Sequence, residues 1–134
     1  MSTNRRLRAF VGGTPRTAKS GPQTPGLKDW KASLRAALLD CRVISGPCAA
    51  RIDFLLPPDL FQEGNTQNPH GPDLDNLAEP VLDALASTIL QPTGGDGAIV
   101  KLVVTKRPSR GRERPGVNIT LKALRARRRR PAMK

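Results

Sequence analysis

The chain has 134 residues, and 23 Lys and Arg against 11 Asp and Glu give it a formal net charge of +12. This length predicts a single domain, and the charge predicts a polyanionic partner, with nucleic acid favoured over an anionic membrane surface. No apolar run reaches the roughly 18 residues that a membrane-spanning helix needs, and the first residues lack the apolar core of a secretory signal. We therefore expect a cytoplasmic protein that is associated with the nucleoid when it is bound to DNA.

Residues suited to base stacking or to zinc binding are scarce. The chain has three Phe, one Trp and no Tyr, whereas proteins that bind single strands use aromatic side chains as stacking platforms. Binding should therefore depend on backbone charge and DNA shape. Cys41, Cys48 and the single histidine, His70, are too few for a Cys/His zinc site, and both cysteines are expected to be small core residues.

The first half of the chain predicts a strand, a helix and a second strand. Residues 7–11 form a short strand, and the stretch 12–26, rich in Gly, Pro, Thr and Ser, forms a loop. Helical spacing then begins, with these residues on one apolar face: Trp30, Leu34, Ala37, Leu38 and Cys41. Ile52, Phe54 and Leu56 have the alternation of a strand, which Pro57 ends.

The second half predicts a helix and two strands after a polar segment at 62–71. The helix covers about 76–90, and its apolar arc comprises Leu77, Val81, Leu82, Leu85 and Ile89. Pro80 removes a hydrogen bond unless it lies in the first turn, so the helix should begin close to Asn76. Strands at 99–105 and 117–121 are joined by the turn-rich residues 107–116, which fit a hairpin.

The resulting order, β-α-β-α-β-β, predicts a single α+β domain with a mixed sheet and two helices. We assign this domain to residues 1–124. Residues 125–134 include four consecutive arginines and predict a basic tail that is disordered until it meets a phosphate backbone.

Acidic residues are concentrated in one part of this basic chain. Asp73 and Asp75 stand at the start of the second predicted helix, and Glu79 and Asp83 follow at intervals of four. Asp75, Glu79 and Asp83 therefore form one ridge beside the apolar face. Asp96 precedes the next strand, and it reaches the same place if that strand packs along the helix.

Two interpretations of these carboxylates remain open. Hydrolysis of a phosphodiester needs a generated hydroxide and cations that absorb the developing charge, and Mg²⁺ held by two or three carboxylates provides both. Asp and Asn at a helix start are also ordinary caps, which alone explains residues 73–76. A calcium-binding loop is excluded, because Ala78 occupies its glycine position and Ala84 its final Glu.

Two stretches carry a more specific signal: PDLDNLAEPVLDAL at residues 72–85 and DGAIVKLVVTK at residues 96–106. They resemble the RusA family of Holliday-junction resolvases, the crossover junction endodeoxyribonucleases. That family has P-D-x-D-N-L-x-K-P-x-x-D-A-L, then D-D-x-x-V and a strand that ends in Lys. The resemblance is close over these stretches, and it extends loosely to the order of the elements and to Pro15 and Arg16 in the first loop.

The resemblance implies a RusA-like fold and a homodimer that nicks four-way or branched DNA symmetrically, in DNA recombination and repair. It implies Mg²⁺ as the cofactor, with Mn²⁺ as a substitute. Asp73, Asp75 and Asp96 would be the catalytic metal ligands, and Lys106 would contact a phosphate. Asp83 would contact the ligand side chains and not the metal itself, or it would serve as a structural cap partner.

Two departures from the family pattern bear on the catalytic rate. Glu79 replaces the family lysine, and Gly95 replaces the first acid of its paired aspartates. Neither removes one of the three implied ligands. Asn76 would orient a ligand carboxylate, although helix capping explains it equally well.

Further DNA contacts are expected from the arginines between the last two strands and from the first loop: Arg107, Arg110, Arg112, Arg114 and Arg16. His70 is either a general base or a surface residue. Two alternatives stay open beside the nuclease: a RusA-like protein that binds junctions with weak or no cleavage, and a basic RNA- or ribosome-associated protein.

Overall fold

The structure, a computed structural model, describes residues 6–17, 26–44, 46–61, 72–90 and 98–124. The predicted basic tail lies outside these ranges. Within them the elements are β1 (Arg6–Gly12), α1 (Leu27–Leu39), β2 (Cys48–Leu56), the short 3-10 helix η2 (Pro58–Phe61), α2 (Leu74–Ala86), β3 (Ile99–Pro108) and β4 (Gly116–Ala123). None of the helices in these ranges is long and apolar enough to cross a membrane.

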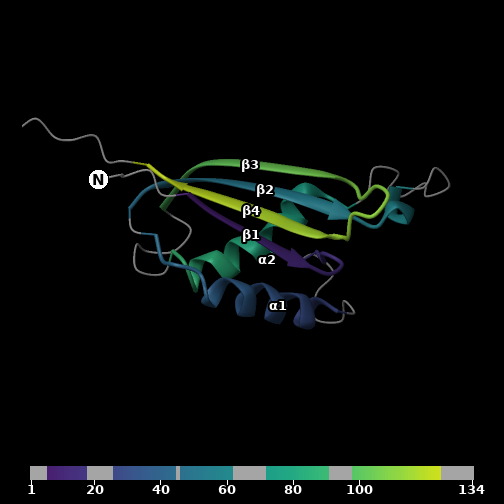
Figure 1. Ribbon diagram of the computed structural model, residues 1–134, viewed down its shortest axis with the longest axis horizontal. Coiled ribbons are helices and arrows are strands. Elements are labelled where there is room, and N and C mark those ends of the chain that lie inside the picture. The colour runs from purple at the N-terminus through teal and green to yellow at the C-terminus, as the bar shows by residue number, and fades with distance from the viewer. Residues whose placement is uncertain (1–5, 18–25, 45, 62–71, 91–97, 125–134) are drawn as a thin grey trace, which may run out of the picture.

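The strands form a mixed four-stranded sheet in the order β1-β4-β2-β3. β4 lies antiparallel to both β1 and β2, whereas β2 and β3 are parallel. Both α-helices lie on the same side of the sheet, and no other described element covers its opposite face (Figure 1). The expected α+β class, with a mixed sheet and two helices in the described residues, is confirmed.

The expected hairpin between the last two strands is wrong, because β2 lies between β3 and β4. The pairing follows burial. β4 buries Val117, Ile119 and Leu121 completely, which suits an inner strand, whereas β3 exposes Val100 and Leu102 and lies at an edge. Crossing two strand spacings requires about 9.6 Å, which the seven residues 109–115 can easily span.

The core lies between the helices and the face of the sheet that they cover. Alternate residues of β2 face this core, and Ile52 and Phe54 are fully buried. Opposite them lie the buried residues of α1: Leu27, Trp30, Leu34 and Leu38. The two α-helices are also joined by a hydrogen bond of 2.9 Å from Arg35 Nη1 to Ser87 Oγ. Cys48 is buried as expected, and Cys41 is half-buried.

Helix α2 begins two residues earlier than predicted, at Leu74, so Pro80 lies in the helix interior and not in its first turn. The proline removes one N–H donor and costs about 3 kcal/mol. Leu77, Val81 and Leu85 are fully buried on the same helix. At about 1.5–3 kcal/mol for each side chain, their burial outweighs the proline. The helix therefore continues through Pro80.

We predict that Ile52→Ala destabilises the protein by about 2–5 kcal/mol, because the side chain is fully buried on an inner strand and its removal leaves a cavity. Val100→Ala is the control on the edge strand. Val100 is 62% exposed, so truncation of its side chain should change stability by no more than about 0.5 kcal/mol. Urea unfolding measures both, and equal losses would contradict the strand order.

Candidate functional site

The acidic start of α2 is the part of the structure that the sequence singled out most strongly. Asp73 is the N-cap residue, with extended backbone angles (φ −68°, ψ 140°), and Asp75 lies in the first helical turn. Both side chains are exposed. The backbone carbonyl of Asp73 accepts the Leu77 N–H at 3.1 Å, so the chain enters the helix directly after this residue.

The capping interpretation is only partly supported by the side chains. The carboxylate of Asp73 makes no capping hydrogen bond with the helix. Asp75 Oδ1 accepts the backbone N–H of Asn76 at 2.9 Å. Both negative charges are still favoured by the positive end of the helix dipole. Asp73 therefore has oxygen lone pairs available for another partner.

Lys106 lies beside this helix start. Its register with the buried Phe54 places it on the helix-covered face near the end of β3. Its Nζ donates a hydrogen bond of 2.6 Å to the carbonyl oxygen of Pro72, the residue immediately before Asp73. A positive side chain is thus anchored to the residue that precedes Asp73.

The predicted acidic ridge is present on α2. Asp75, Glu79 and Asp83 are all exposed and follow one another at single-turn spacing. The ion pairs within the described ranges are Arg51–Asp53 and Arg107–Glu113, so no ridge carboxylate is in an ion pair there. The ridge is consequently a strip of unneutralised negative charge.

The third expected ligand, Asp96, lies outside the described residues, as do Gly95 and His70. Within the described ranges no group of three or more His, Cys, Asp or Glu side chains could hold a metal ion. β3 starts about 23 Å from Lys106, at the strand rise of 3.3 Å per residue. Ile99, the first residue of β3, is therefore at the opposite end of the sheet from Asp73 and Asp75.

The connection between β3 and β4 contains an ion pair that sequence reasoning missed. Arg107 Nη1 and Nη2 donate to the two carboxylate oxygens of Glu113, each at 2.7 Å, and the Arg110 backbone N–H donates to Glu113 Oε1 at 2.8 Å. These interactions lower the pKa of Glu113 to about 2, with the Arg107 hydrogen bond as the largest cause. The charge of Arg107 is therefore matched internally. Arg110 and Arg112 are exposed.

The expected DNA contacts Arg16 and Arg114 lie against other groups of the protein. The Arg16 side chain approaches the backbone of Gly26, where φ is 81°. A Cβ atom added at Gly26 would lie 2.9 Å from Arg16 Nε. Arg114 stacks on Phe10 with its guanidinium carbon 5.6 Å from the ring centre. Arg114 nevertheless remains exposed and so keeps its charge at the surface.

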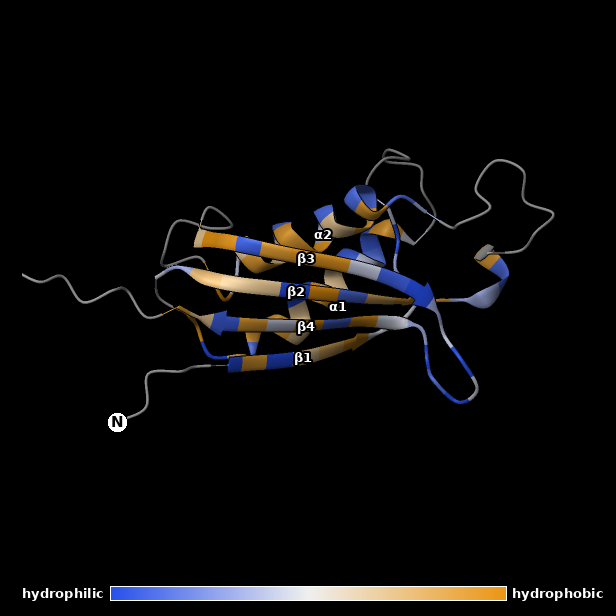
Figure 2. Cartoon of the chain, turned by 90° about the horizontal axis from the view of Figure 1, so that it is seen from above, coloured by the Kyte–Doolittle hydropathy of each residue, from blue (hydrophilic) through white to orange (hydrophobic). Residues whose placement is uncertain are grey.

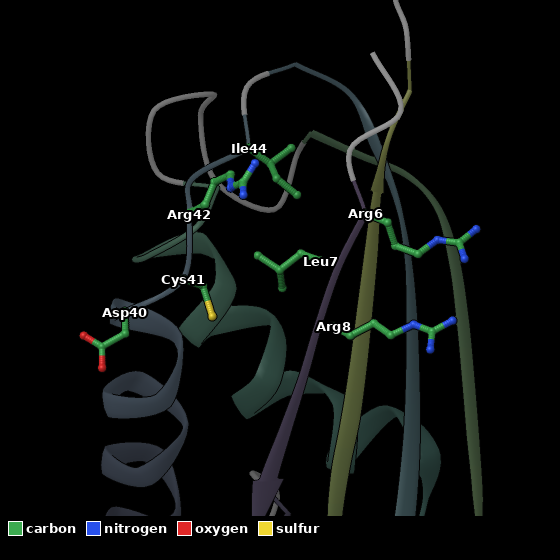
Figure 3. A pocket seen from close by; sticks show the side chains of 7 residues that line it. All are labelled: Arg6, Leu7, Arg8, Asp40, Cys41, Arg42 and Ile44. Atoms are coloured by element: carbon green, nitrogen blue, oxygen red, sulfur yellow. The ribbon is translucent and has the colours of Figure 1, made fainter. Parts of the chain in front are cut away.

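A separate pocket of about 410 Å³ lies between β1 and the residues that follow α1 (Figure 3). Leu7, Cys41 and Ile44 line it, while the side chains of Arg6 and Arg8 point away from Leu7. This pocket contains no grouping of catalytic side chains. The alternation of Arg6 and Arg8 with apolar residues was the signal that could have singled out these two arginines from the sequence.

No protein-family model matches this chain, and a search of curated proteins found no match. The resemblance to the RusA family therefore rests on residues 72–85 and 96–106.

We predict that the Glu113 carboxyl titrates with a midpoint near 2, well below its ordinary value of 4.5. Because this folded-state pKa is depressed, the contribution to stability is present above pH 4.5 and is lost as pH falls toward 2. Arg107→Gln should move the midpoint upward, and Arg112→Gln should leave it unchanged. Carbon-13 NMR of the carboxyl group measures all three proteins, and a wild-type midpoint near 4.5 would contradict the ion pair.

Proposed function

We propose that this protein is a Mg²⁺-dependent, structure-selective endonuclease that nicks Holliday junctions or related branched DNA in recombination and repair. The observation that carries the proposal is the start of α2. Two exposed carboxylates stand there, Asp73 has no capping bond, and Lys106 is hydrogen-bonded to the residue before Asp73. The basic charge of the chain supports a nucleic-acid substrate.

The chemistry of these donors fits Mg²⁺. This ion takes oxygen ligands, is commonly held by one or two carboxylates, and keeps several of its waters. Asp73 and Asp75 supply oxygen ligands at an exposed position. In our proposal Asp96 supplies the third carboxylate, and Mn²⁺ can replace Mg²⁺. The bound ion would contribute an activated water and stabilisation of the developing phosphate charge.

The protein side chains would position the DNA for this attack. Lys106 has three N–H donors and uses one of them on Pro72, so it can donate another to a phosphate oxygen. The bond to Pro72 fixes the direction of the lysine and reduces the entropy lost on binding. Arg110 and Arg112 are exposed on the β3–β4 connection and would hold a DNA arm by its phosphates.

Symmetric nicking of a four-way junction requires two active sites, which a homodimer with twofold symmetry supplies most simply. We therefore include a homodimer in the proposal. Such a dimer also offers a second copy of Asp96. In the dimer this second copy would supply the third carboxylate, because β3 begins at the opposite end of the sheet from Asp73 and Asp75 of the same chain.

A second candidate function is junction binding with weak or no cleavage. Glu79 favours it, because this exposed carboxylate stands one turn from Asp75, at the position of the family lysine. A third candidate, a basic RNA- or ribosome-associated protein, is separated from both by comparing affinity for four-way DNA with affinity for duplex RNA.

We predict that Asp75→Asn lowers the rate of junction nicking by at least about a hundredfold, because it removes a ligand charge while keeping the size of the side chain. Junction binding in EDTA should be unchanged or tighter. Asp29→Asn is the matched control, since Asp29 is also an exposed carboxylate in the first turn of a helix. Equal nicking by both variants and wild type would remove Asp75 from the mechanism.

We predict that Glu79→Lys raises the nicking rate at saturating Mg²⁺ and weakens the apparent affinity for Mg²⁺, because it restores a cation and removes a negative charge beside the metal ligands. One positioned charge is commonly worth about a hundredfold in rate. Asp83→Lys makes the same change in charge one turn further along the ridge, and it should have a smaller effect.

Glu79→Gln separates a missing cation from a recruited ligand. If Glu79 has become a ligand, Glu79→Lys abolishes nicking and Glu79→Gln reduces it in a Mg²⁺ titration. If neither substitution changes the rate or the Mg²⁺ dependence, Glu79 lies outside the site and the assignment of the ridge to catalysis is wrong.

A further inference from the structure

The face of the sheet opposite the helices is basic. Strand register places the same set of alternating positions on this face in all four strands. Figure 2 looks onto it, with α1 and α2 behind the strands. Five exposed cations occupy these positions: Arg6 and Arg8 on β1, Arg51 on β2, Lys101 on β3 and Lys122 on β4.

These cations are neutralised very little by neighbouring acids. Asp53 is the acidic residue on this face of the described strands, and it accepts hydrogen bonds from Arg51 Nε and from Thr105 Oγ1. Within the described ranges Arg6, Arg8, Lys101 and Lys122 are in no ion pair. Four positive charges therefore face solvent with their full hydrogen-bonding capacity.

Several of these cations also occupy neighbouring positions across the sheet. Arg6 pairs with Lys122 across β1 and β4, and Ala49 of β2 pairs with both Lys122 and Lys101. These positions form one row across the sheet. A shallow hollow of about 240 Å³ on this row is lined by Arg6, Arg51, Lys101 and Lys122, together with Ala49 and Thr120. Figure 3 shows Arg6 and Arg8 directed away from the helix side of β1.

We propose that this open face binds the phosphate backbone of duplex DNA and forms a second contact surface, distinct from the acidic start of α2. The charge of the face is complementary to a polyanion, and its cations lie at adjacent strand spacings of about 4.8 Å. Each phosphate neutralised by a lysine or arginine releases counterions, which drives association without reading the base sequence.

Two other occupants fit the face less well. A single strand would need several exposed aromatic rings for base stacking, but the described strands carry one aromatic residue on this face, Phe10, and Arg114 stacks on its ring. A second copy of the chain packed face to face would bring two sets of unpaired cations together, and like charges in an interface oppose association.

The surface lies away from the proposed nicking site. Lys101 precedes Lys106 by five residues, or about 17 Å along β3, and their side chains are on opposite faces of the sheet. DNA bound on the open face would therefore be a different segment from the one beside Asp73. This inference concerns binding alone and does not require cleavage.

The test compares two double variants of equal charge. Lys101→Gln/Lys122→Gln removes two cations from the open face, and Lys28→Gln/Lys31→Gln removes two exposed cations from α1. Each lowers the net charge by two. Fluorescence anisotropy with a short blunt DNA duplex, in EDTA and over a range of salt concentrations, gives the affinity and its salt slope. Circular dichroism and thermal unfolding establish that both variants are folded.

The expected result is a salt slope that becomes shallower by about two units in the open-face variant, because each lost phosphate contact removes about one unit. The α1 variant should change by less than about half a unit. Equal changes in the two variants would overturn the proposal, because they would show that net charge alone governs binding. Failure of the wild type to bind DNA, with binding to phosphatidylserine vesicles instead, would also overturn it.

An NMR titration provides a readout that does not depend on variants. Addition of the duplex should shift the backbone amide signals of open-face positions such as Val103 and Thr120, while those of Lys28 and Lys31 stay in place. Shifts confined to α1 would overturn the proposal. A change from dimer to monomer in the Lys101→Gln/Lys122→Gln variant, with an unchanged salt slope, would assign the face to a second copy of the chain.

Discussion

The handedness of the two crossover connections determines most of this architecture. β1, β2 and β3 are mutually parallel and follow one another in the same direction across the sheet, with β4 inserted between the first two. Connections between parallel strands are almost always right-handed. Two such connections that advance in the same direction place both helices on one face, as Figure 1 shows. The other face is left to the solvent or to a partner.

This arrangement gives the two faces of each strand different chemistry. On β4, Val117, Ile119 and Leu121 pack into the core, while Lys122 belongs to the open face. The same topology makes α2 run opposite to β3, which brings its first turn to the end of the strand that carries Lys106. One set of connections thus positions both the acidic helix start and the basic sheet surface.

The sequence predicted the individual helices and strands better than it predicted which strands pair with one another in the sheet. Alternation in residues 117–121 and helical spacing around Trp30 reflect burial along a single segment, so they are visible locally. The position of β4 between β1 and β2 depends on pairing between distant segments, and the short connection after Pro108 favoured a hairpin instead. The interior position of Pro80 was missed for a similar reason, because tertiary burial outweighs the cost of a local hydrogen bond.

The candidate site shows the same difference between features that one segment encodes and features that depend on distant segments. Asp73 and Asp75 were identified from their spacing and from the family resemblance, and both are exposed at the start of α2. The contact of Lys106 with the Pro72 carbonyl spans 34 positions, and no local pattern encodes it. The Arg107–Glu113 pair was missed because all the arginines between the last two strands were expected to contact DNA.

The place of β4 has a consequence for synthesis on the ribosome. This strand occupies an inner position of the sheet, yet it follows the other described elements in the chain. Without it, β1 has no strand partner among the described residues and β2 pairs with β3 alone. The nascent chain therefore holds an incomplete sheet with open edges until β4 has been synthesised.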